Sequence, residues 1–184
     1  VKRASGFYLM LTFQADIDIP DMPIRGHVVG IDVGLQYFLS TSDGLEIGPP
    51  RFFVEMQREL KLLQRRLKRK EIGSSNWRKM QKKVARLHER ISNTRKDFHF
   101  KTARRLCEQG ETIAVEQLNL VGLSRGFLGK HMLDAGHGQF LNQILPWVCW
   151  KRGTAYIKVD ARGTSQECPD CGARVSKVLK DRWH

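Results

Sequence analysis

The chain has 184 residues, of which 41% are hydrophobic, and its 32 lysines and arginines outnumber 19 acidic residues. This length predicts one medium-sized domain, or one domain with a small appendage. The net charge of +13 indicates a polyanionic partner, most simply nucleic acid. No apolar run approaches the roughly 18 residues that a membrane span needs, so we expect no membrane partner.

Residues 6–19 alternate in hydrophobicity and predict a first strand. The residues that would share its apolar face are Phe7, Leu9, Leu11 and Phe13. Such a strand needs a partner encoded before Val1. Because the chain also begins without methionine, we expect a piece of a longer protein and assign residues 1–22 to the end of a preceding domain.

The stretch His27–Ser40 predicts a buried strand that ends in an acid, turns at glycine and returns as a second strand. Asp32 interrupts the apolar run, and a carboxylate there has to be paired, hydrated or bound to metal. Two interpretations stay open: a solvated strand end, or a carboxylate that a rigid strand presents to a divalent cation. A turn at residues 42–44 leads to a short third strand at 45–47.

Residues 51–105 carry two apolar stripes at helical spacing and predict an antiparallel helical hairpin. The turn between the helices lies at residues 73–76. We expect Ser75 or Asn76 to be the N-cap of the second helix, which should end near Gly110.

The predicted hairpin carries 19 basic and 5 acidic residues, a net charge of +14, so it holds the whole positive excess of the chain. A solvated helical face is the plain interpretation, but ordinary i,i+4 pairing would need about as many acids as bases. We therefore predict a surface that binds phosphate backbones. Its candidate residues are Arg65, Arg66, Lys68, Arg69, Arg78, Lys79, Lys82, Lys83 and Arg86.

Residues 112–118 predict another core strand, which Glu116 interrupts as Asp32 interrupts the first. Two such strands can lie side by side, and their carboxylates repel each other unless a cation lies between them. Mg²⁺ prefers this all-oxygen environment. Asp32 and Glu116 together therefore predict a magnesium site with carboxylates roughly 4 to 6 Å apart.

The segment 119–138 is rich in glycine and is interpreted as an irregular lid over the two acids. Its histidines, His131 and His137, are interpreted as surface or capping residues. Residues 139–152 predict a helix that Pro146 bends or breaks. We expect Cys107 and Cys149 to be core residues.

Residues 154–159 predict a fifth strand, parallel to the fourth. Asp160 follows this strand and is interpreted as a solvated strand end rather than a third metal ligand.

Cys168 and Cys171 form a CPxCG knuckle, whose turn directs both thiolates to one tetrahedral cation. They are the only two of four cysteines that lie close in sequence, which favours a reducing compartment and a metal site over a disulfide framework. A structural zinc needs four ligands, and a second pair normally follows about 15 to 20 residues later. We therefore expect residues 164–184 to be half of a zinc ribbon and do not favour His184 as a replacement ligand.

In this order, these segments resemble the C-terminal nuclease region of the transposon-encoded TnpB proteins and the related type V CRISPR effectors. GIDVGLQYFLSTSDG, residues 30–44, resembles their first RuvC motif, with Asp32 in the acidic position. AVEQLNL, residues 114–120, resembles the second, with Glu116 in that position. The helical hairpin and VDARGTSQECPDCG, residues 159–172, match as well.

The resemblance implies an α/β fold of the RNase H-like (RuvC) type. This fold has a mixed five-stranded sheet with flanking helices, an inserted basic helical hairpin at 51–110 and a truncated zinc ribbon. Residues 1–22 would end a wedge-type domain, 23–163 would form the nuclease domain, and 164–184 would begin the ribbon.

The family's activity is RNA-guided DNA cleavage, which implies guide RNA, target DNA and the remaining domains of the parent polypeptide as partners in a prokaryotic cytoplasm. It further implies two Mg²⁺ ions, with Asp32 bridging both and Glu116 holding one, and zinc on Cys168 and Cys171. The family's third catalytic aspartate lies beyond the complete ribbon, so we expect this chain alone to be inactive.

Two other classes of function stay open. Sugar kinases and actin-like ATPases share the RNase H-like sheet and use a similar turn to cradle phosphate, although the basic hairpin and the cysteine knuckle disfavour them. The other class is non-enzymatic, either a guide-dependent DNA-binding regulator that does not cleave or a truncated structural fragment.

Overall fold

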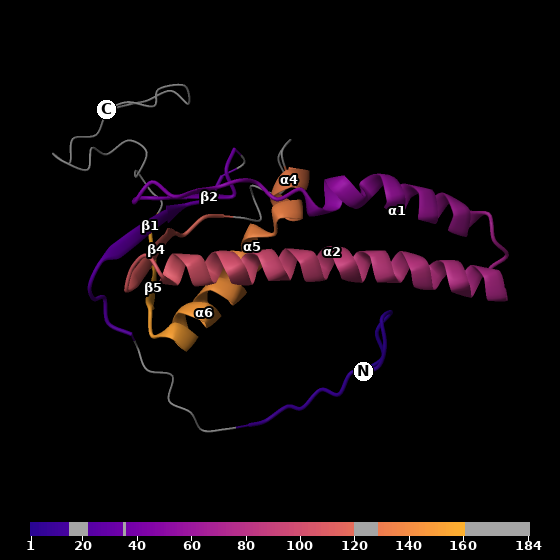
Figure 1. Ribbon diagram of the computed structural model, residues 1–184, viewed down its shortest axis with the longest axis horizontal. Helices are drawn as coiled ribbons and strands as arrows, with labels where there is room; N and C mark the ends of the chain where they lie inside the picture. The colour runs from indigo at the N-terminus through magenta and orange to yellow at the C-terminus, as the bar shows by residue number, and fades with distance from the viewer. Residues whose placement is uncertain (15–21, 35, 120–128, 161–184) are drawn as a thin grey trace.

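The computed structural model describes residues 1–14, 22–34, 36–119 and 129–160 (Figure 1). Five strands form one sheet in the order β3-β2-β1-β4-β5. They are β1 (Val28–Asp32), β2 (Leu39–Thr41), β3 (Glu46–Ile47), β4 (Thr112–Glu116) and β5 (Ala155–Val159). The helices are α1 (Phe52–Lys68), α2 (Ser75–Cys107), α4 (Gly129–Ala135), α5 (His137–Gln139), the π-helical η1 (Phe140–Ile144) and α6 (Leu145–Arg152). The predicted α/β class with a mixed five-stranded sheet is confirmed.

The sheet is parallel at one side and antiparallel at the other. β1 pairs in parallel with β4, and β4 with β5, as predicted for the fifth strand. β2 runs antiparallel to β1, and β3 antiparallel to β2. Alternate residues of β1 and β4 are buried in one hydrophobic core with residues of α2, η1 and α6. Helices α2, η1 and α6 therefore cover one face of the sheet. None of the helices in the described ranges combines the length and the apolar character that a membrane span requires.

An aromatic cluster joins the helices to the start of β2. Phe38 is fully buried between the rings of His99 and His137, whose centroids lie 5.6 and 4.6 Å from its own. His99 Nε2 donates to the Ala135 carbonyl at 2.8 Å, and His137 Nε2 donates to the Phe38 carbonyl at 3.0 Å. The interpretation of His137 as a surface or capping residue is therefore wrong, because it packs inside the core. His131 has no described side chain.

Gly136, between α4 and α5, permits this close packing. Its φ of +71° lies in the left-handed region. A Cβ at this position would also lie 2.9 Å from Arg95 Cδ and 3.1 Å from His99 Cε1.

Helices α1 and α2 lie side by side (Figure 1) and share an apolar contact of Phe52, Leu60, Leu87 and Ile91. Ser74 is the N-cap of α2, since its hydroxyl accepts from the Trp77 N–H at 3.1 Å. The N-cap therefore lies one or two residues before the predicted Ser75 or Asn76. α2 also ends at Cys107, before Gly110. Gly110 serves a different purpose, because a Cβ there would lie 2.6 Å from the His27 carbonyl.

In two segments the structure differs from the predicted conformation. Residues 6–14 contain no strand beyond an isolated bridge between Lys2 and Phe7, and the predicted apolar face is exposed. No described strand lies beside this segment to complete its hydrogen bonds. The predicted irregular stretch also contains a helix, α4, at its described end.

The helical stretch before β5 is continuous through Pro146 but changes its hydrogen bonding. In η1, Leu145 donates its N–H to the Phe140 carbonyl, five residues back. In the same five-residue pattern, Pro146 would be the hydrogen-bond donor to the Leu141 carbonyl, but proline has no N–H. The Tyr156 hydroxyl supplies the missing donor, at 2.7 Å from that carbonyl. A strand residue thus completes the helix that covers it.

The change Tyr156→Phe should lower the free energy of unfolding by about 1 to 2 kcal/mol, because it leaves the Leu141 carbonyl without its donor. Urea unfolding measures the change. Tyr8→Phe is the control and should stay within about 0.5 kcal/mol of the wild type, because the hydrogen bond of the Tyr8 hydroxyl to Ser5 at 2.8 Å is exposed and water can replace it. Equal stability of the Tyr156 variant and the wild type would contradict the role of this hydroxyl.

His99 is a buried histidine that favours its neutral form. Burial lowers its pKa from 6.5 to about 4, and the positive charge of Arg95 acts in the same direction, while the hydrogen bond to the Ala135 carbonyl opposes both. Its Nδ1 has no hydrogen-bond partner in the described part of the chain, so protonation there would bury an unpaired donor.

Between about pH 6.5 and 4 the unfolded chain binds a proton at His99 that the folded chain does not, so stability should fall as the pH falls. The expected contribution of this residue is about 3 kcal/mol across that window. His99→Gln keeps a donor for the Ala135 carbonyl and should flatten the dependence, as measured by urea unfolding at several pH values. An unchanged slope in the variant would show that another group is responsible.

Candidate active site and basic helical surface

The register of β1 and β4 brings Asp32 and Glu116 to the same position on neighbouring strands. Ile31 pairs with Val115, and the two acids follow these residues in their parallel strands. Because side chains alternate along a strand, both acids lie on the sheet face opposite buried Ile31 and Val115. Asp32 is exposed and Glu116 half-buried.

Both acids line one hollow of about 390 Å³ on this face, here called the acidic hollow. Gly30, which has no side chain, and Ala114, which has only a methyl group, lie two residues before the acids on the same face of the sheet. The residues that line the hollow are Gly30, Ile31, Asp32, Ser40, Thr41, Ser42, Ala114, Glu116 and Val159. Carboxylate and hydroxyl oxygens make up its polar side chains, and these are the ligands that Mg²⁺ prefers. The donor set therefore fits the predicted metal.

A chain of hydrogen bonds fixes the rim of the acidic hollow beside β1. Ser42 accepts from the Gly30 N–H at 3.1 Å and donates to Asp43 at 3.1 Å, and the other oxygen of Asp43 lies 2.7 Å from His27 Nε2. The hydrogen bond from His27 lowers the pKa of Asp43. The sequence identified residues 42–44 only as a turn, because nothing in the local pattern placed His27 beside Asp43.

Asp160 is exposed and follows the last residue of β5, Val159, which pairs with Glu116. Within the described ranges no group of three or more His, Cys, Asp or Glu side chains could hold a metal ion. Cys168 and Cys171 lie outside the described residues, so the zinc prediction stays a prediction.

The predicted core position of Cys149 is confirmed, and Cys107 is half-buried against it, with the two sulfur atoms 3.7 Å apart.

The nine predicted phosphate-binding residues lie on the last turns of α1, the α1–α2 turn and the first half of α2. They are Arg65, Arg66, Lys68, Arg69, Arg78, Lys79, Lys82, Lys83 and Arg86, and we call them the basic surface. All nine are exposed, and none forms an ion pair with a described residue. In Figure 1 the α1–α2 turn and the sheet lie at opposite ends of α2.

The OrfB_IS605 family, described as "Probable transposase", matches residues 14–125, more than half of the chain. The chain belongs to the TnpB family. A second family description, "Cas12f1-like, TNB domain", matches residues 137–184.

Two curated proteins are similar to this TnpB-family chain. "Putative RNA-guided DNA endonuclease InsQ" of Escherichia coli (strain K12) is 29% identical over 202 residues, which cover 100% of this chain and 50% of that protein. "Putative RNA-guided DNA endonuclease" of Streptomyces pristinaespiralis is 32% identical over 162 residues, covering 87% and 40% respectively. The TnpB-family chain thus spans half or less of the length of these relatives.

Among solved structures, the "Cryo-EM structure of the Cas12f1-sgRNA-target DNA complex" matches with a TM-score of 0.52 and 19% identity. The match covers 86% of the TnpB-family chain and 41% of the Cas12f1 chain. At this identity the likeness shows the fold alone.

Proposed function

We propose that the chain is the RNase H-like (RuvC) nuclease domain of an RNA-guided DNA endonuclease, with Asp32 and Glu116 as its metal-binding catalytic acids. The observation that carries the proposal is their equivalent position on neighbouring parallel strands, where both line the acidic hollow. The names of the two curated relatives support a nuclease role. Under this proposal residues 1–22 end a wedge-type domain, 23–163 form the nuclease domain with its hairpin at 51–110, and 164–184 belong to a zinc ribbon.

In the proposed site, Asp32 and Glu116 would hold two Mg²⁺ ions, with Asp32 as a ligand of both and Glu116 as a ligand of one. When bound, the ions lower the pKa of water and offset the charge that develops on the phosphate. The strands hold both carboxylates at fixed positions, and the small Gly30 and Ala114 leave room for a phosphodiester beside them. Cys168 and Cys171 are proposed to bind structural zinc.

The basic surface is proposed to bind the sugar–phosphate backbones of guide RNA and target DNA, and its residues other than Arg78 and Lys82 are proposed to lie along the guide–target duplex. Its cations form no ion pair with a described residue and suit phosphates. They do not recognise the base sequence, because base pairing between guide and target provides that recognition. Guide RNA and target DNA are therefore the proposed partners, together with the remaining domains of the parent protein. The similar Cas12f1 structure is a complex with sgRNA and target DNA, which supports this choice.

A regulator that binds DNA with a guide but does not cut is a second candidate. It would need only the basic surface, whose binding to phosphates requires no metal ion. Binding of target DNA without cleavage by the parent protein would support the regulator.

Asp32→Asn and Glu116→Gln should each reduce target cleavage by the guide-loaded parent protein by more than about 100-fold, because each removes a charged metal ligand. Gel analysis of cleaved DNA measures the effect, and Mg²⁺ titration calorimetry should show weakened binding. Asp97→Asn, at an exposed carboxylate on α2, is the control and should cut normally. Normal cleavage by either of the first two variants would exclude that residue from catalysis.

Neutralising Lys68, Lys79 and Lys83 together with glutamine should flatten the dependence of log affinity on log salt by about 2.7 for duplex DNA. Fluorescence anisotropy at several salt concentrations measures this slope. Lys101 is a suitable control, since it is already paired with Asp97 at 2.7 Å, and Lys101→Gln should leave the slope unchanged. If the triple variant keeps the slope of the wild type, the basic surface does not contact DNA.

A further inference from the structure

The N-terminal turn, residues 1–8, folds back on itself and attaches to α2. Val1 accepts from the Tyr8 N–H at 2.8 Å, and Arg3 donates to the Gly6 carbonyl at 2.8 Å. Both the N–H and the hydroxyl of Ser5 donate to the Glu89 carboxylate, at 2.9 and 2.7 Å. Residues 84 positions apart in the chain are thus held together on the exposed side of α2.

A second contact supports the same attachment, since Arg86 Nε donates to the Ala4 carbonyl at 3.2 Å. Glu89 forms no ion pair with any residue that the structure describes, so its described contacts are with the N-terminal turn and not with the neighbouring cations.

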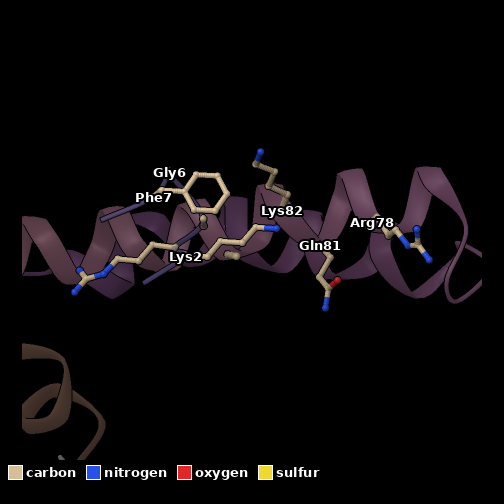
Figure 2. A pocket seen from close by; sticks show the side chains of 9 residues that line it. Lys2, Gly6, Phe7, Arg78, Gln81 and Lys82 are labelled. Carbon is tan, nitrogen blue, oxygen red and sulfur yellow. The ribbon is translucent and has the colours of Figure 1, made fainter. Parts of the chain in front are cut away.

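A pocket of about 470 Å³ lies between the N-terminal turn and α2, and we call it the turn pocket. Figure 2 shows its lining side chains, with Lys2 and Phe7 from the turn and Gln81 and Lys82 from α2. The full lining is Lys2, Arg3, Ala4, Gly6, Phe7, Arg78, Gln81, Lys82 and Ala85.

The charge of the turn pocket is entirely positive. Four of its lining residues are basic and none is acidic. None of the four forms an ion pair with any residue that the structure describes. Four cations without an ion-pair partner around one pocket suit an anionic ligand, and a phosphate diester can accept hydrogen bonds from more than one of them.

The pocket also offers an aromatic ring. The Phe7 side chain is 84% exposed, and Lys2 Nζ lies 5.9 Å from its ring centroid. A ring at this exposure can stack with a flat heterocycle, such as a nucleic-acid base. Gln81 adds a carboxamide, which both donates and accepts hydrogen bonds.

We propose that the turn pocket binds an unpaired nucleotide of an RNA strand. The phosphate lies among Lys2, Arg78 and Lys82, and the base stacks on Phe7. Gln81 recognises the ribose 2′-hydroxyl, which distinguishes RNA from DNA. A duplex does not fit, because its bases are stacked on each other and cannot reach the ring. The choice of RNA rests on the proposed function, in which the guide RNA is the strand that folds and leaves nucleotides unpaired.

The test is oligonucleotide binding in EDTA, which makes it independent of metal in the acidic hollow. Fluorescence anisotropy with labelled decauridylate should show about tenfold weaker binding by Phe7→Ala than by the wild type. Phe13→Ala is the matched control, since Phe13 is 82% exposed but does not line the turn pocket, and it should bind as the wild type does. A decauridylate with abasic sites should bind both phenylalanine variants and the wild type equally.

The cation and ribose contacts have separate readouts. Lys82→Gln should weaken binding of the normal and the abasic RNA alike, whereas Lys96→Gln, at an exposed lysine elsewhere on α2, should change neither. The wild type should prefer decauridylate over decathymidylate several-fold, and Gln81→Ala should remove this preference. Circular dichroism confirms that each variant folds.

Unchanged RNA binding by Phe7→Ala would overturn the stacking site, and equal or tighter binding of decathymidylate by the wild type would overturn the assignment to RNA. Asp32→Asn protein should bind decauridylate as the wild type does. If RNA binding behaves as described but the parent protein does not cleave DNA, the nuclease proposal fails while the turn pocket stands.

Discussion

The parallel pairing of β1 with β4 is the constraint on which the proposed chemistry depends. Val29, Ile31, Ile113 and Val115 are buried on the helix-covered face, so the core fixes the register of the two strands. A slip of one residue would move every side chain of a strand to the other face. It would bury one acid and place a large apolar residue in the acidic hollow. Core packing therefore positions the two carboxylates on the open face, and no separate device is needed to align them.

The helices that cover the sheet are held by the ring stack around Phe38. Its two histidines hydrogen-bond backbone carbonyls at Ala135 and Phe38, so their polar edges are satisfied while their ring faces pack as apolar surfaces. The stack links α2, α5 and the start of β2, and β2 carries part of the rim of the acidic hollow. The same helix, α2, carries the basic surface at its other end, about 50 Å along its 33 residues. One rigid element thus joins the two proposed sites.

The local sequence pattern was sufficient to predict an element wherever one hydrophobic periodicity dominates the segment. The β-branched runs that end in Asp32 and Glu116 predicted β1 and β4, and the apolar stripes at spacings of three and four predicted α1 and α2. Since both acids end parallel strands, their proximity could also be predicted.

Other features depend on contacts that are distant in sequence. His137 stands among glycines, and its burial depends on contacts such as the stack with Phe38, which is 99 residues away. Likewise, nothing near Pro146 indicates that Tyr156 would replace its missing N–H. Residues 6–14 have the alternation of a strand, but alternation does not supply a neighbouring strand.

Burial along α2 is uneven, so the two halves of this helix differ in how well they resist local opening. Its buried residues begin at Leu87, so the first twelve residues are covered mainly by α1 and the N-terminal turn. Local opening costs least where few apolar contacts are lost, and repulsion among the cations lowers the cost further. Backbone amides near the α1–α2 turn should therefore exchange with solvent much faster than those near Leu106. The basic end can open and close by itself while the strands that hold the acids remain folded, and a bound polyanion would slow that opening by neutralising the repulsion.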